Sequence, residues 1–305
     1  MAQKDVKDRI GSVKNIQKIT RAMEMVAAAR LRRAEQRIEA LRPYASAIRR
    51  MTRQAAEAAQ NVPNLPILQE HDSVSNVGIL LVTGDRGLAG AFNSQIVRAG
   101  IRAGNDVDGD VRWFASGRRG VSSLTFRGRD VVGEYTGFTD RPAYGNARDI
   151  AADLMTAYVD GDVDQVDIFY NRYISPLSQE VTRETLLPLQ QATIFEGSDE
   201  ESLGGRAGAD EEEERRDGPR ALVEYEPGPE DILQRLVPAY VEISIYRALL
   251  ESTASEHGAR MTAMRNASEN ATDIIKDLTL QMNRERQAEI TQEIMEVVAG
   301  AEALT

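Results

Sequence analysis

The stretch that decides the fold is DILQRLVPAYVEISIYRALLESTASEHGARMTAMRNASENATDIIKDLTLQMNRERQAEITQEIMEVVAGAEAL, residues 231–304. Its only proline is Pro238, and no glycine lies between Ile232 and Glu256. One seam of residues, spaced alternately by four and three positions, runs unbroken along it, which is the heptad pattern of a coiled coil. The seam consists of Leu236, Tyr240, Ile243, Arg247, Leu250, Ala254, His257, Met261, Met264, Ser268, Ala271, Ile275, Leu278 and Met282. Such a helix runs on the order of 100 Å, longer than a globular domain is wide.

The middle of this seam is weak, because arginine, alanine, histidine and serine replace large aliphatic residues there. The helix therefore needs a partner helix, and residues 3–60 predict one. Its apolar stripe is formed by Val6, Ile10, Val13, Ile16, Ile19, Met23 and Val26, continued by Ala34, Ile38, Leu41, Ile48 and Met51. Pro43 should bend or locally break this helix, and Pro63 and Pro66 should end it. The two stripes are most simply covered by winding the two helices round each other in antiparallel fashion.

Between the helices, strand and helix signals alternate. Strands are predicted at 76–83, 111–116, 130–135, 166–171 and, as an antiparallel edge, 180–187; helices are predicted at 92–103, 118–126 and 143–158. This alternation indicates a Rossmann-like α/β domain with a largely parallel sheet. The fold class is therefore mixed: a long antiparallel coiled coil of the terminal helices plus an α/β domain.

The predicted organisation has four parts: an N-terminal coiled-coil helix at 1–62, the α/β domain at 74–195, an acidic insert at 196–218, and a foot segment with the C-terminal helix at 219–305. Residues 196–217 carry ten acids against three arginines and almost no aliphatic residues. This composition predicts a disordered or mobile loop.

Charge is unevenly distributed in a chain whose formal net charge is −11. Residues 1–60 carry fourteen Lys and Arg against six Asp and Glu, which suggests an acidic partner for the first helix. Nucleic acid is a weaker interpretation, because no aromatic residues are interleaved with the basic ones.

The absence of cysteine excludes disulfides, thiolate zinc sites and thiol switches. No apolar run predicts a membrane span or signal peptide, so we expect a soluble, most simply cytoplasmic chain.

The most enzyme-like motif is GDRGLAG, residues 84–90, which follows a predicted strand and precedes a helix. Its backbone N–H groups could hold a phosphate, but the G-x-x-G-x-x-G spacing matches neither the dinucleotide nor the Walker pattern. A tight turn is the favoured interpretation, with Asp85 and Arg86 paired to each other or to a neighbouring chain.

His257 lies on the seam and is interpreted as a packing residue, and His71 is far from it in sequence; no spacing predicts a metal site. Met23 and Met25 could be coiled-coil packing or an adaptable contact surface.

Four stretches together resemble one known family, the gamma subunits of F-type ATP synthases. They are IGSVKNIQKITRAMEMVAAARLRRAEQR (10–37), DRGLAGAFN (85–93), ARMTAMRNASENA (259–271) and RQAEITQEIMEVVAGAEAL (286–304). The last is similar to the family signature I-T-x-E-[IL]-x-E-[IV]-x-x-G-A. The resemblance runs end to end and in order, although GLAG stands in place of the more usual GLCG, the acidic insert is longer than usual, and the chloroplast dithiol insert is missing.

The resemblance implies an asymmetric axle inside a ring of three alpha and three beta subunits, standing on the membrane-embedded c-ring beside the epsilon subunit. Proton flow would turn it at the cytoplasmic face of the bacterial cell membrane, and catalysis would belong to the alpha–beta interfaces, so the chain would need no cofactor and hold no catalytic residue. By resemblance, Met23, Arg30 and Arg33 meet the acidic lever loop of beta. Arg260, Arg286, Gln287, Thr291, Glu293 and Glu296 match positions that touch beta or steady the axle, and Tyr225 and Glu226 match the foot on the c-ring and epsilon.

Two other functions remain open on the sequence alone. One is a nucleotide-dependent enzyme that uses the GDRGLAG turn, and it predicts saturable nucleotide binding by the isolated chain. The other is a coiled-coil scaffold or filament protein with a nucleotide-binding α/β domain, and it predicts self-association through the seam.

Overall fold

The computed structural model describes residues 3–58, 66–69, 71, 73–189 and 228–302. The chain divides into two compact units. The first combines residues 1–29 with 260–305, and the second comprises residues 30–259. The acidic insert at 196–218 and the beginning of the foot segment lie outside the described residues.

Two long helices pass through both units: α1 (Gln3–Ala58) and α7 (Pro229–Glu302). The expected break at Pro43 is absent, because α1 continues through it, and α7 likewise continues through Pro238. Pro43 is exposed, and its neighbours Ala45 and Ile48 are buried against Ile243 of α7. Leu41, before the proline, packs against the same cluster, so packing on both sides of Pro43 holds the helix together despite the lost backbone donor.

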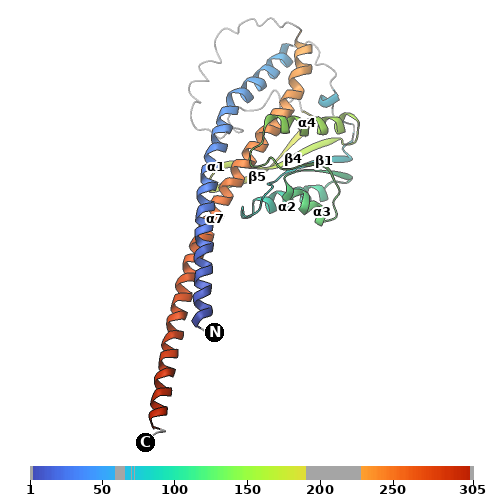
Figure 1. Ribbon diagram of the computed structural model, residues 1–305. Coiled ribbons are helices and arrows are strands. Elements are labelled where there is room, and N and C mark those ends of the chain that lie inside the picture. Colours follow the sequence, from blue (N-terminus) through green and yellow to red (C-terminus); the bar gives the residue numbers. More distant parts are fainter. Residues whose placement is uncertain (1–2, 59–65, 70, 72, 190–227, 303–305) are drawn as a thin grey trace. The chain divides into compact units, whose positions relative to one another are not determined.

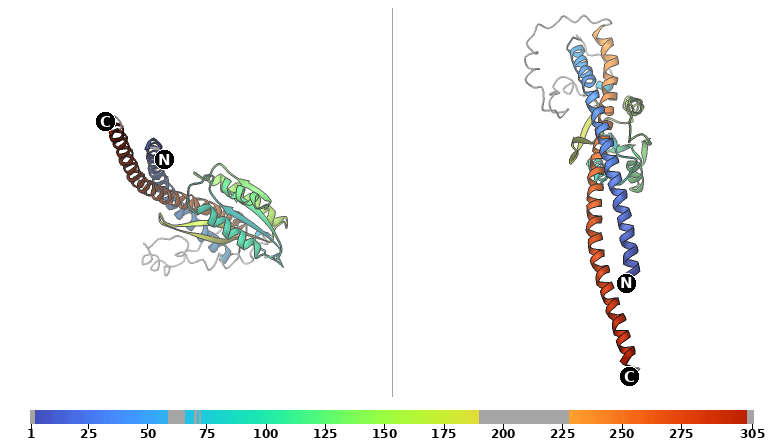
Figure 2. Two further views of the ribbon diagram at one scale, coloured as in Figure 1. Left: turned by 90° about the horizontal axis from the view of Figure 1, so that it is seen from below. Right: turned by 60° about the vertical axis from the view of Figure 1, so that its left-hand side comes forward.

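In the first unit the start of α1 and the far half of α7 lie side by side and antiparallel (Figures 1 and 2). Val6 and Ile10 of α1 are buried with Leu278 of α7, and Ile275 and Met282 pack against them. Farther along, the Gln17 side-chain amide donates a hydrogen bond to Thr272 Oγ1 at 2.7 Å, and Arg265 Nε lies 3.0 Å from Glu24 Oε1. Polar contacts between α1 and α7 therefore accompany the apolar packing in this unit.

The predicted α1 stripe is wrong in its middle. Ile16, Ile19 and Val26 are 54%, 59% and 53% exposed, whereas Thr20 and Ala27 are buried. The observed seam passes through Val6, Ile10, Val13, Gln17, Thr20, Glu24, Ala27, Leu31 and Ala34, which keeps the four-and-three spacing. The physical reason is that polar residues occupy the seam where α7 offers serine and threonine, so hydrophobicity alone selects residues one position away from it.

The second unit contains a five-stranded sheet in the order β3-β2-β1-β4-β5. Its strands are β1 (Asn76–Val82), β2 (Asp110–Ser116), β3 (Val131–Tyr135), β4 (Gln165–Ser175) and β5 (Ser178–Leu187). The first four are parallel, and β5 pairs antiparallel with β4. All five strands lie where the sequence predicts them, with β4 extending farther than expected.

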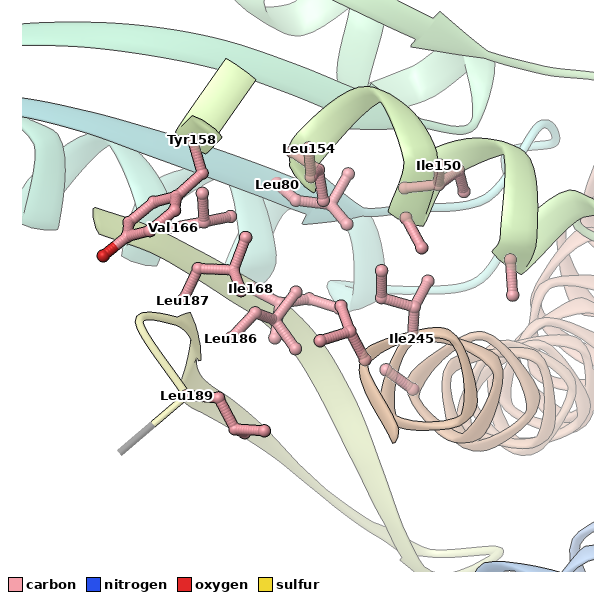
Figure 3. Packing of buried hydrophobic residues seen from close by; sticks show 14 of the residues in the cluster. Leu80, Ile150, Leu154, Tyr158, Val166, Ile168, Leu186, Leu187, Leu189 and Ile245 are labelled. Carbon is pink, nitrogen blue, oxygen red and sulfur yellow. The ribbon is translucent and has the colours of Figure 1, made fainter. Parts of the chain in front are cut away.

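Helices cover both faces of this sheet (Figure 1). On one face, α4 (Tyr144–Val159) and the first half of α7 share a core in which Leu154 and Ile245 approach Leu80 and Ile168 (Figure 3). On the other face, α2 (Phe92–Asn105) and α3 (Arg118–Phe126) pack around Ile96. A short 3-10 turn, η1 (Pro66–Leu68), adds Ile67 to the first core. The α/β domain is therefore completed by α7, a helix that the sequence places in another part of the chain.

Candidate interaction surfaces

The glycine turn after β1 is built around the carboxylate of Asp85. Its Oδ2 accepts hydrogen bonds from the backbone N–H groups of Gly137 (2.9 Å) and Thr139 (3.2 Å) and from Thr139 Oγ1 (2.9 Å), and its Oδ1 accepts one from the Arg118 N–H at 3.1 Å. Burial favours the neutral acid, yet these hydrogen bonds outweigh it and lower the pKa of Asp85 below its ordinary value. Within the turn itself, the Gly84 N–H donates to Asn93 Oδ1 at 2.8 Å and the Asp85 N–H donates to Thr139 Oγ1 at 2.9 Å, so two of the N–H groups that could have held a phosphate already have partners.

The expected pairing of Asp85 with Arg86 is wrong, whereas pairing of either residue with a neighbouring chain stays a prediction. Arg86 instead lies 3.7 Å from Asp140, and Asp85 bonds the backbone. Leu88 (φ 63°) and Gly90 (φ 56°) both take left-handed conformations, as a tight turn requires. The structure therefore favours the tight turn over the phosphate loop.

A nucleotide would also need a crevice beside the glycine turn. Open α/β sheets bind ligands beyond the carboxyl ends of their strands, at the point where the strand order reverses, which in this sheet lies between β1 and β4. Here α7 fills that crevice. Ser252 Oγ donates to the Val82 carbonyl at 3.2 Å, and Ser255 Oγ donates to the Asn171 carbonyl at 3.0 Å. A Cβ added to Gly84 would lie 2.6 Å from the Glu256 carboxylate, and the hollow that remains is about 10 Å³. That space holds about one water molecule.

Other catalytic or metal signals are weak in the described part of the chain. No cluster of His, Cys, Asp and Glu there could hold a metal ion. His71 Nδ1 lies 2.8 Å from Asp164 Oδ1, and Asp164 Oδ2 accepts hydrogen bonds from the backbone N–H groups of Ser75 and Asn76, so Asp164 fastens the connection before β1. His257 is 1% exposed, consistent with a packing residue. Among the described helices, none combines the length and apolarity needed to cross a membrane.

The α1 residues singled out by resemblance differ in their surroundings. Met23 is half-buried beside the coiled-coil seam. The Arg30 guanidinium already has an internal partner, since its NH1 lies 2.7 Å from Asp140 Oδ2. Arg33 is exposed and lines a hollow of the second unit.

The α7 residues also divide into two groups. Arg260 is only 8% exposed, so it faces the interior of the chain. The others, Arg286, Gln287, Thr291, Glu293 and Glu296, are all exposed. Their hydrogen bonds stay within the helix: Thr291 Oγ1 donates to the Gln287 carbonyl, and Gln292 donates to Glu296. Tyr225 and Glu226 lie outside the described residues.

Sequence reasoning missed two exposed apolar surfaces in the first unit. The outer stripe of α1 (Ile16, Ile19, Met25 and Val26) faces away from the seam, and the tip of α7 exposes Ile290, Ile294, Met295, Val297 and Val298. Runs of large exposed apolar side chains are typical of surfaces that meet a partner. In the sequence, the exposed stripe of α1 is indicated by apolar residues that lie one position away from the heptad seam.

Comparison with known proteins agrees with this architecture. The family described as ATP synthase matches residues 2–304. The ATP synthase gamma chain of Rubrobacter xylanophilus is 40% identical over 301 residues, covering 99% of this chain and 98% of that one. The ATP synthase gamma chain of Heliobacterium modesticaldum is 42% identical over 304 residues, with the same coverage.

Solved structures share the fold. A chain from the cryo-EM structure of the Tetrahymena thermophila mitochondrial ATP synthase central stalk and c-ring matches with a TM-score of 0.59 at 28% identity, covering 82% of this chain and 99% of that one. A chain from the Euglena gracilis mitochondrial ATP synthase matches with a TM-score of 0.64 at 16% identity over 99% of this chain and 94% of that one, which speaks for the fold alone. With end-to-end identity near 40% to these curated relatives, the chain belongs to the ATP synthase gamma chain family.

Proposed function

We propose that this chain is the central-stalk rotor subunit of a proton-translocating F-type ATP synthase. The observation that carries the proposal is the 40% identity to an ATP synthase gamma chain along 99% of the chain. The likeness to a chain of the Tetrahymena central stalk supports it independently. Rotation of the c-ring would be passed through the two long helices to the catalytic subunits, coupling proton flow to ATP synthesis or hydrolysis.

The proposed partners are three alpha and three beta subunits, the epsilon subunit and the c-ring. The proposed location is peripheral, on the cytoplasmic face of a bacterial cell membrane. The curated relatives from Rubrobacter, Heliobacterium and Desulfitobacterium support a bacterial setting. Tyr225 and Glu226 are proposed as part of the foot that stands on the c-ring and epsilon.

We further propose that the chain has no active site of its own. Two observations favour this. The crevice where doubly wound sheets bind ligands is filled by Ser252, Ser255 and Glu256 of α7. In the glycine turn, the N–H groups of Gly84 and Asp85 already donate to side chains of the same unit. The filament alternative is disfavoured as well, because the seam of α7 is covered by α1 of the same chain.

Mechanically, a rotor needs a stiff shaft whose outer contacts are weak enough to change with angle. Buried seam residues supply stiffness, and the exposed apolar stripes supply a lopsided outer surface. Three equal partners around one asymmetric surface make different contacts with it at any moment. These differences would couple the angle of the shaft to the state of each catalytic subunit.

Specific residue roles are proposed from the resemblance to the family. Met23, Arg30 and Arg33 are proposed to meet the acidic lever of beta, and the exposed α7 residues Arg286, Gln287, Thr291, Glu293 and Glu296 are proposed to contact beta directly. Arg260 is buried, so of its two possible roles we assign it that of steadying the axle.

A native pull-down tests the assembly. The tagged full-length chain, expressed in its own host, should retain alpha and beta subunits and ATP hydrolysis activity in the eluate. Recovery of the folded chain without alpha and beta would contradict the proposed function.

A further inference from the structure

A hollow lies within the second unit, between α1, α7 and the connection from β3 to α4. Its volume is about 570 Å³, which falls within the range of small-molecule sites. It is lined by Arg30, Arg33, Ala34, Gln36, Arg37, Ala40, Asp140, Arg141, Leu250 and Thr253. We call it the arginine cleft.

The arginine cleft has an excess of positive charge. It contains four guanidinium groups and a single acid, Asp140. That acid is already shared, with its Oδ2 2.7 Å from Arg30 NH1 and 3.7 Å from Arg86 NH1. Within the described residues, no ion pair joins Arg33, Arg37 or Arg141 to an acid. A concave surface with one sign of charge concentrates ligands of the opposite sign.

The spacing of the arginines indicates what kind of anion fits. Arg30, Arg33 and Arg37 fall on successive turns of one face of α1, so their Cα atoms span roughly 10 Å. A chain of linked anionic groups matches this length better than a single phosphate or carboxylate does. Guanidinium groups bind such oxygens in bidentate fashion, and Leu250 and Ala34 add an apolar floor.

We propose that the arginine cleft is a binding site for a small polyanion carrying two or more phosphate or carboxylate groups. Asp140 acts there as a built-in competitor, because its carboxylate holds Arg30 in the position that a ligand oxygen would take. This site goes beyond the rotor function and does not depend on it. Because the proposed beta contact also uses Arg30 and Arg33, a bound polyanion would compete with an acidic partner for the same side chains.

Titration calorimetry with inorganic tripolyphosphate on the purified full-length chain tests the proposal at low ionic strength. We expect saturable binding that weakens as salt rises, and inorganic phosphate should bind at least about tenfold more weakly, since it reaches fewer arginines. The double variant Arg33→Gln/Arg37→Gln should weaken tripolyphosphate binding about tenfold or more.

The matched control is Arg98→Gln/Arg102→Gln, which removes the same charge from exposed positions of α2 and should leave the affinity nearly unchanged. Asp140→Asn should tighten binding several-fold by releasing Arg30, whereas Asp108→Asn, at an exposed position elsewhere, should not. Circular dichroism verifies the folding of each variant. No binding by the folded wild-type chain, or equal loss in both arginine double variants, would overturn the proposal.

The pull-down with alpha and beta remains informative whichever result is obtained, so the two proposals fail separately.

Discussion

At the scale of single residues, Glu251 is a buried carboxylate whose burial is only partly compensated. It is 6% exposed, its Oε2 has no hydrogen-bond partner, and its Oε1 lies 4.0 Å from Arg247. Arg247 makes its close contact elsewhere, at 2.6 Å from Glu184 Oε2, while the Tyr170 hydroxyl donates to Glu184 Oε1 at 2.6 Å. Burial raises the pKa of Glu251 from 4.5 to about 7, with the nearby Arg247 opposing this and Glu184 adding to it.

This raised pKa sets the sign of a pH effect on stability. Between about pH 4.5 and 7 the folded chain binds the Glu251 proton more tightly than the unfolded chain, so the free energy of unfolding falls as pH rises through this window. Glu251→Gln should remove that dependence and stabilise the chain at pH 8 by about 1–3 kcal/mol, measured by urea denaturation at pH 5 and pH 8. Glu184→Gln, which takes the close partner from Arg247, should instead destabilise it at both values. A loss of stability at pH 8 in Glu251→Gln would show that this carboxylate supports the fold.

Asp85 is the opposite case, a carboxylate whose ionised form is strongly bonded. Asp85→Asn keeps the shape but weakens the acceptance of hydrogen bonds from Gly137, Thr139 and Arg118. We expect about 2 kcal/mol lower stability at pH 7. Because the folded pKa is lowered, the wild-type advantage should shrink as pH falls toward that pKa. Urea midpoints across pH 3–7, compared with the exposed control Asp108→Asn, measure it; equal curves for wild type and Asp85→Asn would contradict the role given to Asp85.

At the scale of elements, the sequence predicts the helices and strands well because their periods differ and glycine or proline marks their ends. It predicts the face of α1 poorly. Gln17 lies in the seam and donates to Thr272, and the buried Thr20 hydroxyl donates to the Gln17 carbonyl. A hydrophobic pattern cannot predict such polar pairings. The hydrophobic pattern therefore predicts Ile16 and Ile19 to be buried in the seam, although both are exposed.

The corrected register makes a direct prediction about two isoleucines. Ile10 is 7% exposed and packs with Leu278, whereas Ile16 is 54% exposed. Ile10→Ala should lower stability by about 2–4 kcal/mol, while Ile16→Ala should change it by less than about 0.5 kcal/mol. Hydrogen exchange of residues 3–29, together with urea denaturation of the full chain, distinguishes the two variants. Similar effects of both substitutions would refute the observed seam.

At the scale of the whole molecule, each unit is assembled from segments distant in sequence. The first unit joins residues 1–29 with 260–305, and α7 completes the α/β domain of the second. The heptad patterns at both ends of the chain predict the coiled coil. The arginine cleft could not be foreseen in the same way, because Arg141 reaches it through the fold and not through any spacing with Arg30.

The central claim is that this chain turns. It contains no cysteine, so a single thiol can be introduced as a handle at Phe126, which is 91% exposed at the end of α3. In the assembled, otherwise cysteine-free complex, with beta subunits fixed to a surface and a gold rod attached to Phe126→Cys, single-molecule imaging should show stepwise rotation in one direction on addition of ATP. Continued ATP hydrolysis with a firmly attached rod that does not rotate would contradict the account.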